Sequence, residues 1–209
     1  MISVLHISDT HGQGETLCRV EDLALRHSGC EVVALTGDCT SKVTTQVPGE
    51  WDQWPQQLKL AVPGNHDLLH TFDLLPSWVT RTPWTSRLDD VIFLGIDSSI
   101  GLAEQLAQLR LEAEGNAGVV LLSHQWPDFE SLTEELCRFL AGRKLVVLHG
   151  HEHPKAFSGS LWEEFVLVNG IGGYRSNVCS SVSRMRGIAN LIIWESGQFE
   201  CSEVQGHWT

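Results

Sequence analysis

Short apolar runs alternate with helical patterns over the first 150 residues, and this alternation limits the fold more than any other feature. The opening run, ISVLHI, is followed by an amphipathic stretch near 15–28 and then by a second apolar run, EVVALT. Apolar runs of this length are typical of buried strands, and apolar residues at helical spacing between them are typical of a crossover helix. The sequence therefore predicts a βαβ unit at its start.

The same alternation continues to residue 150 and then gives way to strands alone. Further strands are predicted at 58–63, 91–97, 118–124 and 144–150. Helices are predicted near 66–75, 102–114 and 130–141. The stretches EFVLVNG, GIANLIIWE and QFECSEV read as hairpin-connected strands, and the turn-rich segment 38–57 reads as a surface loop. Mixed sheets covered by helices are the simplest packing, and 209 residues fit a single domain, 1–209.

Charge and cysteine usage exclude several classes of protein. The formal net charge is −12, so the average surface repels polyanions and long nucleic acid is not an expected partner. Six cysteines without a CxxC pair indicate reduced thiols. The N-terminal stretch has no basic leader pattern and no segment has 18 consecutive apolar residues, so we expect a cytoplasmic protein without a membrane span.

Polar side chains with metal-binding capacity follow five of the apolar runs. They are Asp9 and His11, then Asp38, then Asn65 with His66 and Asp67, then His124, and finally His151 with His153. In open α/β sheets, ligands bind beyond the carboxyl ends of the strands. One polar residue at such a place is more often a turn former or a helix cap, but turn chemistry gives no reason for histidines to recur there.

The mixture of oxygen and imidazole donors suits Mn, Fe, Zn or Ni better than Mg or Ca. Candidate ligands from five strand ends are too many for one ion. Two ions about 3.5–4 Å apart that share a carboxylate would use them all, and such pairs hold the attacking and leaving oxygens during displacement at phosphorus. The residue types therefore predict hydrolysis of a phosphoester.

The motifs SDTH, GD, GNHD, a lone H after a strand, and GHEH occur in this order between residues 8 and 153. Together they resemble the signature of the calcineurin-like metallophosphoesterases. The resemblance implies a four-layer α-β-β-α sandwich of two mixed sheets flanked by helices, with the β-rich tail in the second sheet. It also implies two divalent transition metal ions, of which Mn is favoured, and a hydroxide between them as the nucleophile.

The resemblance also assigns roles to individual residues. The first ion would be held by Asp9, His11, Asp38 and His153, and the second by Asn65, His124 and His151 together with the bridging Asp38. His66, with Asn65 beside it, would lie at the substrate phosphate and donate a proton to the leaving oxygen, and Asp67 would orient the His66 ring.

One motif departs from part of the family. The second motif reads GDCTSK, without the second aspartate and the arginine of the GDxVDRG form, which makes a protein serine/threonine phosphatase unexpected. HISDTH together with GNHD resembles the phosphodiesterase side of the family, which implies a phosphodiesterase acting on a small or nucleotide-like substrate. A diester carries one negative charge and needs less cationic help, which is consistent with this resemblance. The alternatives are a phosphomonoesterase of the same fold and, less favoured because every matching position holds a competent ligand, a metal-free interaction scaffold.

Several residues near the motifs have two interpretations each. His149 is expected to support the site by hydrogen bonding. Trp126 is either a wall for a base or a packing residue, and Trp51 with Trp54 either lines a pocket or packs at the surface. The segment 172–187 contains Arg175, Arg184 and Arg186, and it either lies over the cleft to hold a distal phosphate or carboxylate, or is a solvated loop.

Overall fold

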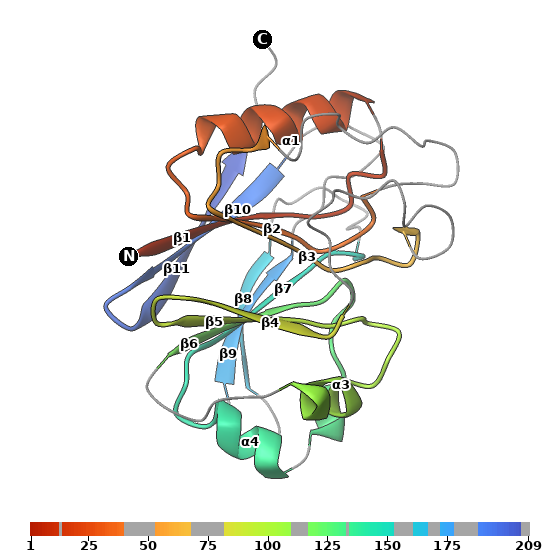
Figure 1. Cartoon of the computed structure of the whole chain (residues 1–209), viewed down its shortest axis with the longest axis vertical. Coiled ribbons are helices and arrows are strands. Elements are labelled where there is room, and N and C mark those ends of the chain that lie inside the picture. Colours follow the sequence, from red (N-terminus) through yellow and green to blue (C-terminus); the bar gives the residue numbers. More distant parts are fainter. Residues whose placement is uncertain are drawn as a thin grey trace.

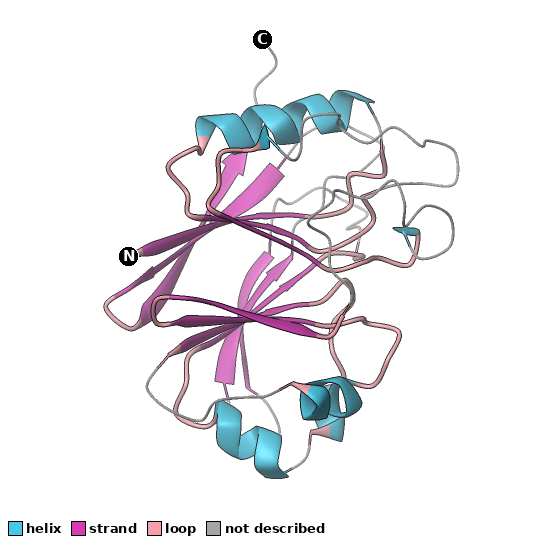
Figure 2. Cartoon of the chain, in the orientation of Figure 1, coloured by secondary structure: helices cyan, strands magenta, loops and turns pink. Residues whose placement is uncertain are grey.

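The computed structural model shows two β-sheets packed face to face, with helices on both outer faces (Figures 1 and 2). It describes residues 1–12, 14–39, 53–67, 82–109, 117–132, 134–152, 161–166, 172–177 and 188–205. Each sheet contains both parallel and antiparallel pairs. The predicted four-layer arrangement of two mixed sheets is therefore confirmed.

The first sheet has the strand order β11-β10-β1-β2-β3. Its strands are β1 (Ile2–Ile7), β2 (Val32–Leu35), β3 (Leu58–Ala61), β10 (Ile188–Glu195) and β11 (Gln198–Gln205). β1, β2 and β3 run parallel, and β10 pairs with β1 in the antiparallel direction. Helix α1 (Gly14–Arg26) covers the outer face of this sheet (Figure 1).

The second sheet has the strand order β4-β5-β6-β7-β9-β8. Its strands are β4 (Trp84–Leu88), β5 (Val91–Gly95), β6 (Gly118–Leu122), β7 (Leu145–His149), β8 (Leu161–Val166) and β9 (Gly172–Asn177). β5, β6, β7 and β9 run parallel. The outer face is covered by α3 (Leu102–Gln108), the short 3-10 helix η3 (Phe129–Ser131) and α4 (Glu134–Leu140).

Three apolar clusters hold the layers together. One lies between α1 and the first sheet, one between the two sheets, and one between the second sheet and its helices. Along β1, Ile2 and Val4 contact the central cluster, whereas Leu5 and Ile7 contact the α1 cluster. Strands buried on both faces read as continuous apolar runs, which is why the pattern along the sequence located them.

The β-rich tail differs from the prediction. We expected it to lie in the second sheet, but β10 and β11 join the first sheet and β8 and β9 join the second. A local pattern identifies a strand but carries no information about its pairing partner. The beginning of the 172–187 segment is also not a loop, because residues 172–177 form β9 between β7 and β8.

Smaller differences concern single elements. The helix expected near 130–141 is divided into η3 and α4. β4 was not predicted, because its alternately exposed residues form no apolar run. Trp54 is buried in the α1 cluster, whereas Trp51, most of the 38–57 segment and most of the predicted 66–75 helix lie outside the described residues. Within the described part of the chain, no helix has the length and apolar character needed to span a membrane.

Candidate metal centre

The loops that carry the predicted ligands meet where the parallel strands of the two sheets end. Asp9 and His11 follow β1, Asp38 follows β2, Asn65 and His66 follow β3, His124 follows β6, and His151 follows β7. Main-chain hydrogen bonds align the first two loops, from Asp9 N–H to the Gly37 carbonyl at 3.0 Å and from His11 N–H to the Asp38 carbonyl at 2.8 Å.

Left-handed backbone conformations occur at four of these residues. Asp9, His11, Asp38 and His151 have φ values of 55°, 49°, 51° and 67°. Non-glycine residues adopt this region rarely and at a cost in free energy, and such conformations occur often at functional sites. The backbone strain here is therefore concentrated at the predicted ligands.

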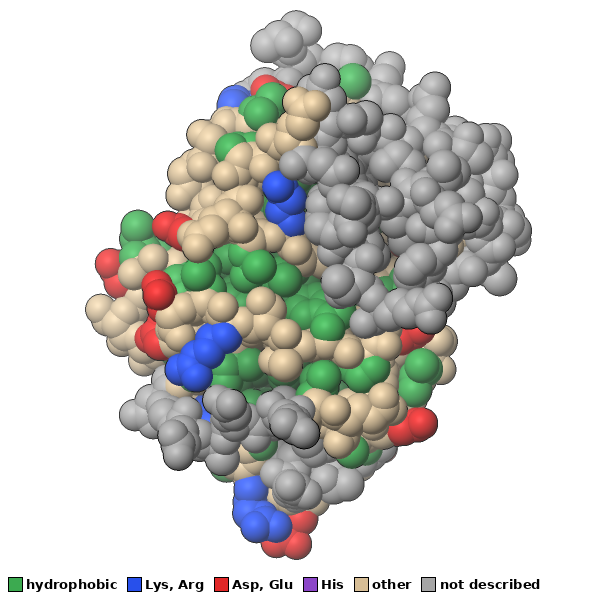
Figure 3. All heavy atoms as spheres, in the orientation of Figure 1, with side chains coloured by type: hydrophobic (Ala, Val, Ile, Leu, Met, Phe, Trp, Pro, Cys, Tyr) green, Lys and Arg blue, Asp and Glu red, His purple; other side chains and the backbone are tan. Residues whose placement is uncertain are grey.

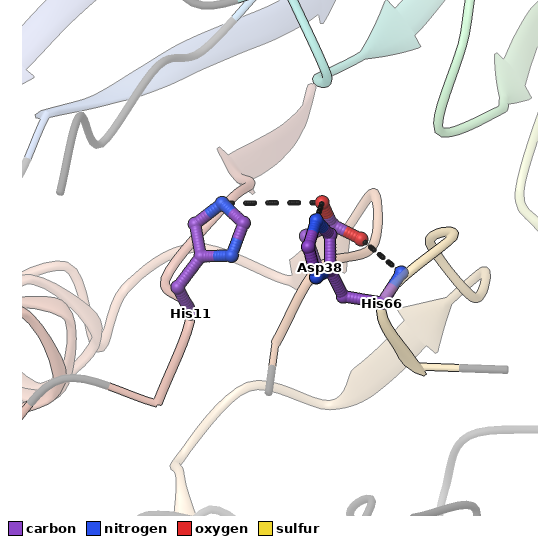
Figure 4. Close-up of side chains that lie close together, drawn as sticks. All are labelled: His11, Asp38 and His66. Atoms are coloured by element: carbon purple, nitrogen blue, oxygen red, sulfur yellow. Dashed lines mark hydrogen bonds and ion pairs between the residues drawn. The ribbon is translucent and has the colours of Figure 1, made fainter. Parts of the chain in front are cut away.

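The first group of possible metal ligands is His11, Asp38 and His66, whose ligand atoms lie within 4.8 Å of one another. The Asp38 oxygen Oδ2 is 3.9 Å from Nε2 of His11 and 3.8 Å from Nε2 of His66. Figure 4 shows the Asp38 carboxylate between His11 and the main-chain nitrogen of His66, which donates to Oδ1 at 2.9 Å. Asp9 adjoins this group, with Oδ1 4.0 Å from Nε2 of His11.

The second group is Asp38, His124 and His151, again within 4.8 Å, and Asn65 lies among them. Nε2 of His124 is 3.4 Å from Oδ2 of Asp38 and 3.0 Å from Oδ1 of Asn65. Nδ1 of His151 is 3.1 Å from the same Asn65 oxygen and 3.3 Å from Nε2 of His124. Asp38 belongs to both groups, which is the position expected of a bridging carboxylate.

The donor set of the second group fits a cation. Nδ1 of His124 is 2.7 Å from the Thr36 carbonyl, which can only accept a hydrogen bond, so Nδ1 carries the hydrogen and Nε2 of the neutral ring carries a lone pair. This lone pair faces the acceptor oxygens of Asn65 and Asp38. The three acceptor atoms are therefore Nε2 of His124, Oδ1 of Asn65 and Oδ2 of Asp38. In the tautomer of His151 with the hydrogen on Nδ1, that nitrogen offers them only one hydrogen, so a positive ion is needed to stabilise them together.

The pKa values of His124 and Asp38 also show that positive charge is favoured at this position. Burial lowers the pKa of His124, but its hydrogen bond to Asp38 and the charge of Asp9 outweigh burial, so that its pKa lies above the ordinary value. Burial raises the pKa of Asp38, but hydrogen bonds from His124 and from the main chain of His66 outweigh it, and the pKa is lowered. Without a metal ion, a proton on His124 supplies the positive charge, so metal ions and protons compete for this position.

Asp9 has a second role in the centre. Its Oδ1 and Oδ2 accept hydrogen bonds from the main-chain N–H of His151, at 3.1 Å and 3.0 Å. Asp9 is fully buried, so these bonds fix the loop after β7 against the loop after β1. The carboxylate thus connects the two sheets at the same place as the candidate ligands.

The contact predicted between Asp67 and the His66 ring is not made through Nδ1. The Asp67 carboxylate accepts a hydrogen bond from the main-chain N–H of Gly64 at 3.0 Å, and Nδ1 of His66 is buried without a hydrogen-bond partner in the described structure. The orienting role of Asp67 through another contact with the ring stays a prediction.

The remaining predicted residues lie outside the groups or outside the described chain. His153, Arg184 and Arg186 fall outside the described residues. Arg175 lies in β9, where it bonds to His149 and Glu152, and its predicted substrate contact stays a prediction. Trp126 packs edge-on against Phe129 and Phe165, which supports the packing interpretation.

Two contributions to the site could not be identified from sequence patterns: the main-chain carbonyl of Thr36 and the pairing of His149 with Arg175. The Thr36 contribution comes from its main-chain carbonyl, for which no side-chain signal exists. His149 is buried, and burial together with the charge of Arg175 lowers its pKa to about 3, so its ring stays neutral. Its supporting position was predicted, but its partner Arg175 was not.

Comparison with known proteins identifies the family of this chain. Residues 2–170 match the family model described as the calcineurin-like phosphoesterase superfamily domain. The chain belongs to this family. Membership indicates a metal-dependent phosphoesterase, and the His and Asp groups described above are its candidate ligands. No curated protein sequence matches the chain.

Solved structures similar to this family member share its fold at low sequence identity. A dimetal phosphatase from Danio rerio superposes with a TM-score of 0.59 at 11% identity, with 98% of this chain and 96% of that chain covered. A novel archaeal phosphodiesterase gives 0.51 at 13% identity, with 97% and 100% covered. A purple acid phosphatase from yellow lupin (Lupinus luteus) gives 0.53 at 9% identity, with 91% and 49% covered.

Proposed function

We propose that this protein is a dinuclear metal-dependent phosphodiesterase that hydrolyses a small or nucleotide-like phosphodiester. The observation that carries the proposal is the convergence of three acceptor atoms, Asn65 Oδ1, His124 Nε2 and Asp38 Oδ2. The hydrogen-bond donors around them are too few to satisfy all three. Asp38 also takes part in the first group with His11 and His66. Two adjacent cation positions that share a carboxylate are the arrangement used for displacement at phosphorus.

The ligands would divide between the two sheets. Asp9, His11 and Asp38, with His153, would hold the first ion, and Asn65, His124 and His151 would complete the second around Asp38. Bound divalent cations supply positive charge that neutralises phosphate oxygens and lowers the pKa of a water molecule. The chain itself supplies the fixed positions, since Asp38 and His124 are buried and Thr36 holds the His124 ring.

His66 is the residue proposed to donate a proton to the leaving oxygen. Its side chain is 35% exposed, whereas that of Asp38 is 2% exposed, so His66 is open to a substrate that approaches the centre. Its ring contacts the His11 ring edge-on at 5.1 Å, which holds it beside the first group. A positioned imidazole of this kind contributes typically about 10²–10⁴-fold to the rate.

The charges of the described residues favour a diester over a monoester. A monoester dianion needs an additional cationic partner, and Arg175 is already paired with Glu152 and bonded to His149. On the face shown in Figure 3, the Lys and Arg side chains of the described residues lie in separate places and form no stripe. The formal net charge of −12 also disfavours a long polyanion, so a small diester is the better substrate.

A comparison of two model esters tests the proposal. The protein is stripped with a chelator, reloaded with Mn²⁺, and assayed with bis-p-nitrophenyl phosphate and p-nitrophenyl phosphate. We expect preferential cleavage of the diester, and loss of this activity in His66→Ala and Asp38→Ala but not in Arg87→Ala, a matched exposed variant on β4. Preference for the monoester would replace the substrate class with a phosphomonoesterase. Failure to bind metal would favour an interaction scaffold.

A further inference from the structure

His151 lies at the centre of a three-residue turn that ends β7. The main-chain N–H of Glu152 donates to the Gly150 carbonyl at 2.8 Å, and the φ of His151 is 67°. A hydrogen bond between residues two apart around a residue with positive φ defines a γ-turn of the rare, strained type. A strained turn persists only where surrounding contacts hold it, so the contacts of Gly150 and His151 decide where the His151 ring points.

His149 supplies one of these contacts. Its Nδ1 lies 3.1 Å from the Gly150 carbonyl, and its Nε2 lies 2.8 Å from Nε of Arg175. An arginine can only donate, so Nε2 of His149 must accept and Nδ1 must carry the hydrogen that is directed at the Gly150 carbonyl. Arg175 thereby selects the tautomer of His149 that stabilises the turn.

Arg175 is itself fixed on three sides. Its guanidinium lies over the Trp126 ring, 4.8 Å from the centroid, and forms an ion pair with Glu152. Trp126 is anchored by edge-on contacts with Phe129 and Phe165 in the outer apolar cluster. The backbone of Arg175 is also fixed, because β9 pairs with β7 and places Arg175 opposite Val147.

We infer that Arg175 is a positioning residue for the second metal ion, acting through His149 and the Gly150 carbonyl on the turn that aims His151 at Asn65 and His124. The side chain need not touch substrate or metal for this role. The inference rests on the proposed function, since it takes the group around His124 and His151 as a metal site. It assigns to Arg175 a different role from that of a substrate contact.

Metal titration of the chelator-treated protein tests the inference. Mn²⁺ is titrated by calorimetry into the wild type, Arg175→Ala, Arg175→Lys and the matched control Arg87→Ala. Residues that orient metal ligands typically contribute about 10–100-fold to metal affinity. We expect Arg175→Ala to weaken the binding of one of the two ions by this factor, while the other ion binds with wild-type affinity. Arg175→Lys retains a donor and should restore part of the loss, and Arg87→Ala should change neither affinity.

A second background tests whether Arg175 acts through His149. In His149→Phe the side chain can neither accept from Arg175 nor donate to the Gly150 carbonyl, so the imidazole relay is absent and adding Arg175→Ala should cause a much smaller further loss than it does in the wild type. Additive losses would overturn the relay. An unchanged affinity in Arg175→Ala, or an equal weakening of both ions together with a lower melting temperature, would overturn the positioning role. If the wild-type protein bound no second ion, the proposed function itself would be overturned. The Mn²⁺ titration of the wild type gives this result separately from the results for the variants.

Discussion

Oδ2 of Asp38 lies 3.4 Å from Nε2 of His124, although one residue follows β2 in the first sheet and the other follows β6 in the second. The pair exists only because the two sheets pack through the central apolar cluster. The candidate metal centre is therefore a property of the sandwich, and neither sheet provides it alone. Substitutions at Asp38 test the part of the centre that both ligand groups share.

Asp38→Asn should abolish binding of both ions, because an amide lacks the charge and the second acceptor that bridge the two groups. Metal ions contribute several kcal/mol of transition-state stabilisation, so diester hydrolysis should fall by at least about 10²-fold. Metal content after dialysis and the hydrolysis rate are the measurements. Asp97→Asn is a matched control, since Asp97 is a buried aspartate after β5 whose Oδ1 accepts from Ser99 instead of facing either group. Retention of two ions in Asp38→Asn would contradict the bridging position.

His66→Ala should separate catalysis from metal binding. If His66 donates a proton and is not a required ligand, kcat should fall about 10²–10⁴-fold while both ions remain bound. Metal analysis and steady-state kinetics on one protein preparation measure both quantities. His27→Ala, at a histidine just after α1, should change neither. Loss of one ion from His66→Ala would instead make His66 a ligand, as its place in the group with His11 and Asp38 allows.

The ends of the buried parallel strands could be predicted because the pattern there is strong. β6 and β7 are buried throughout, and each contains a run of four apolar residues. His124 follows β6 after one residue, and the loop that carries His151 follows β7. Parallel strands place their carboxyl ends at one edge of a sheet, so residues that follow them converge. This argument predicted, without any knowledge of loop conformation, that residues following these strands would lie together, as Asp38, His124 and His151 do.

β9 could not be predicted in the same way. Its sequence, GGYRSN, has no apolar run, although it lies inside the second sheet. A Cβ at Gly173 would lie 2.6 Å from the Leu145 carbonyl and 2.9 Å from the Phe165 ring, so the neighbouring strands fill the space that a side chain would take. The role of Arg175 followed from this placement, since only the pairing with β7 brings it to His149.

The metal-free protein should lose stability as the pH falls below the ordinary pKa of histidine. Burial and the charge of Arg175 lower the pKa of His149 from 6.5 to about 3. Between these values the unfolded chain binds a proton that the folded chain does not, so this contribution to stability is complete above 6.5 and is lost as the pH falls. The loss is about 1.4 kcal/mol for each pH unit in that window.

Urea unfolding in the presence of chelator, followed by tryptophan fluorescence between about pH 7 and about pH 4.5, measures this dependence. His149→Gln should have a shallower decline, because glutamine does not titrate. His6 should account for much of the decline that remains, since burial and then the nearby His149 lower its pKa well below the ordinary value. Parallel stability curves for the wild type and His149→Gln would show that His149 does not stay neutral in the folded protein.

Gly64→Ala should damage the metal centre through steric overlap alone. A Cβ at Gly64 would overlap Oδ1 and the main-chain nitrogen of Asp38. Gly64 is not among the residues with positive φ, and the three nearest atoms that a Cβ would meet all belong to Asp38. Forcing atoms into a packed site costs typically about 1–3 kcal/mol, and relief of the overlap requires Asp38 or the main chain at Gly64 to shift.

The expected result for Gly64→Ala is therefore a lower melting temperature of the metal-free protein together with weaker binding of both ions, because both groups use Asp38. Gly29→Ala is the matched control: nothing lies within 4 Å of a Cβ there, and alanine at a compatible position typically changes stability by less than about 1 kcal/mol. Differential scanning fluorimetry and metal titration of the two variants give the comparison. If Gly64→Ala bound both ions as the wild type does, the Asp38 carboxylate would not need its observed position, and the centre would have to be assigned to other ligands.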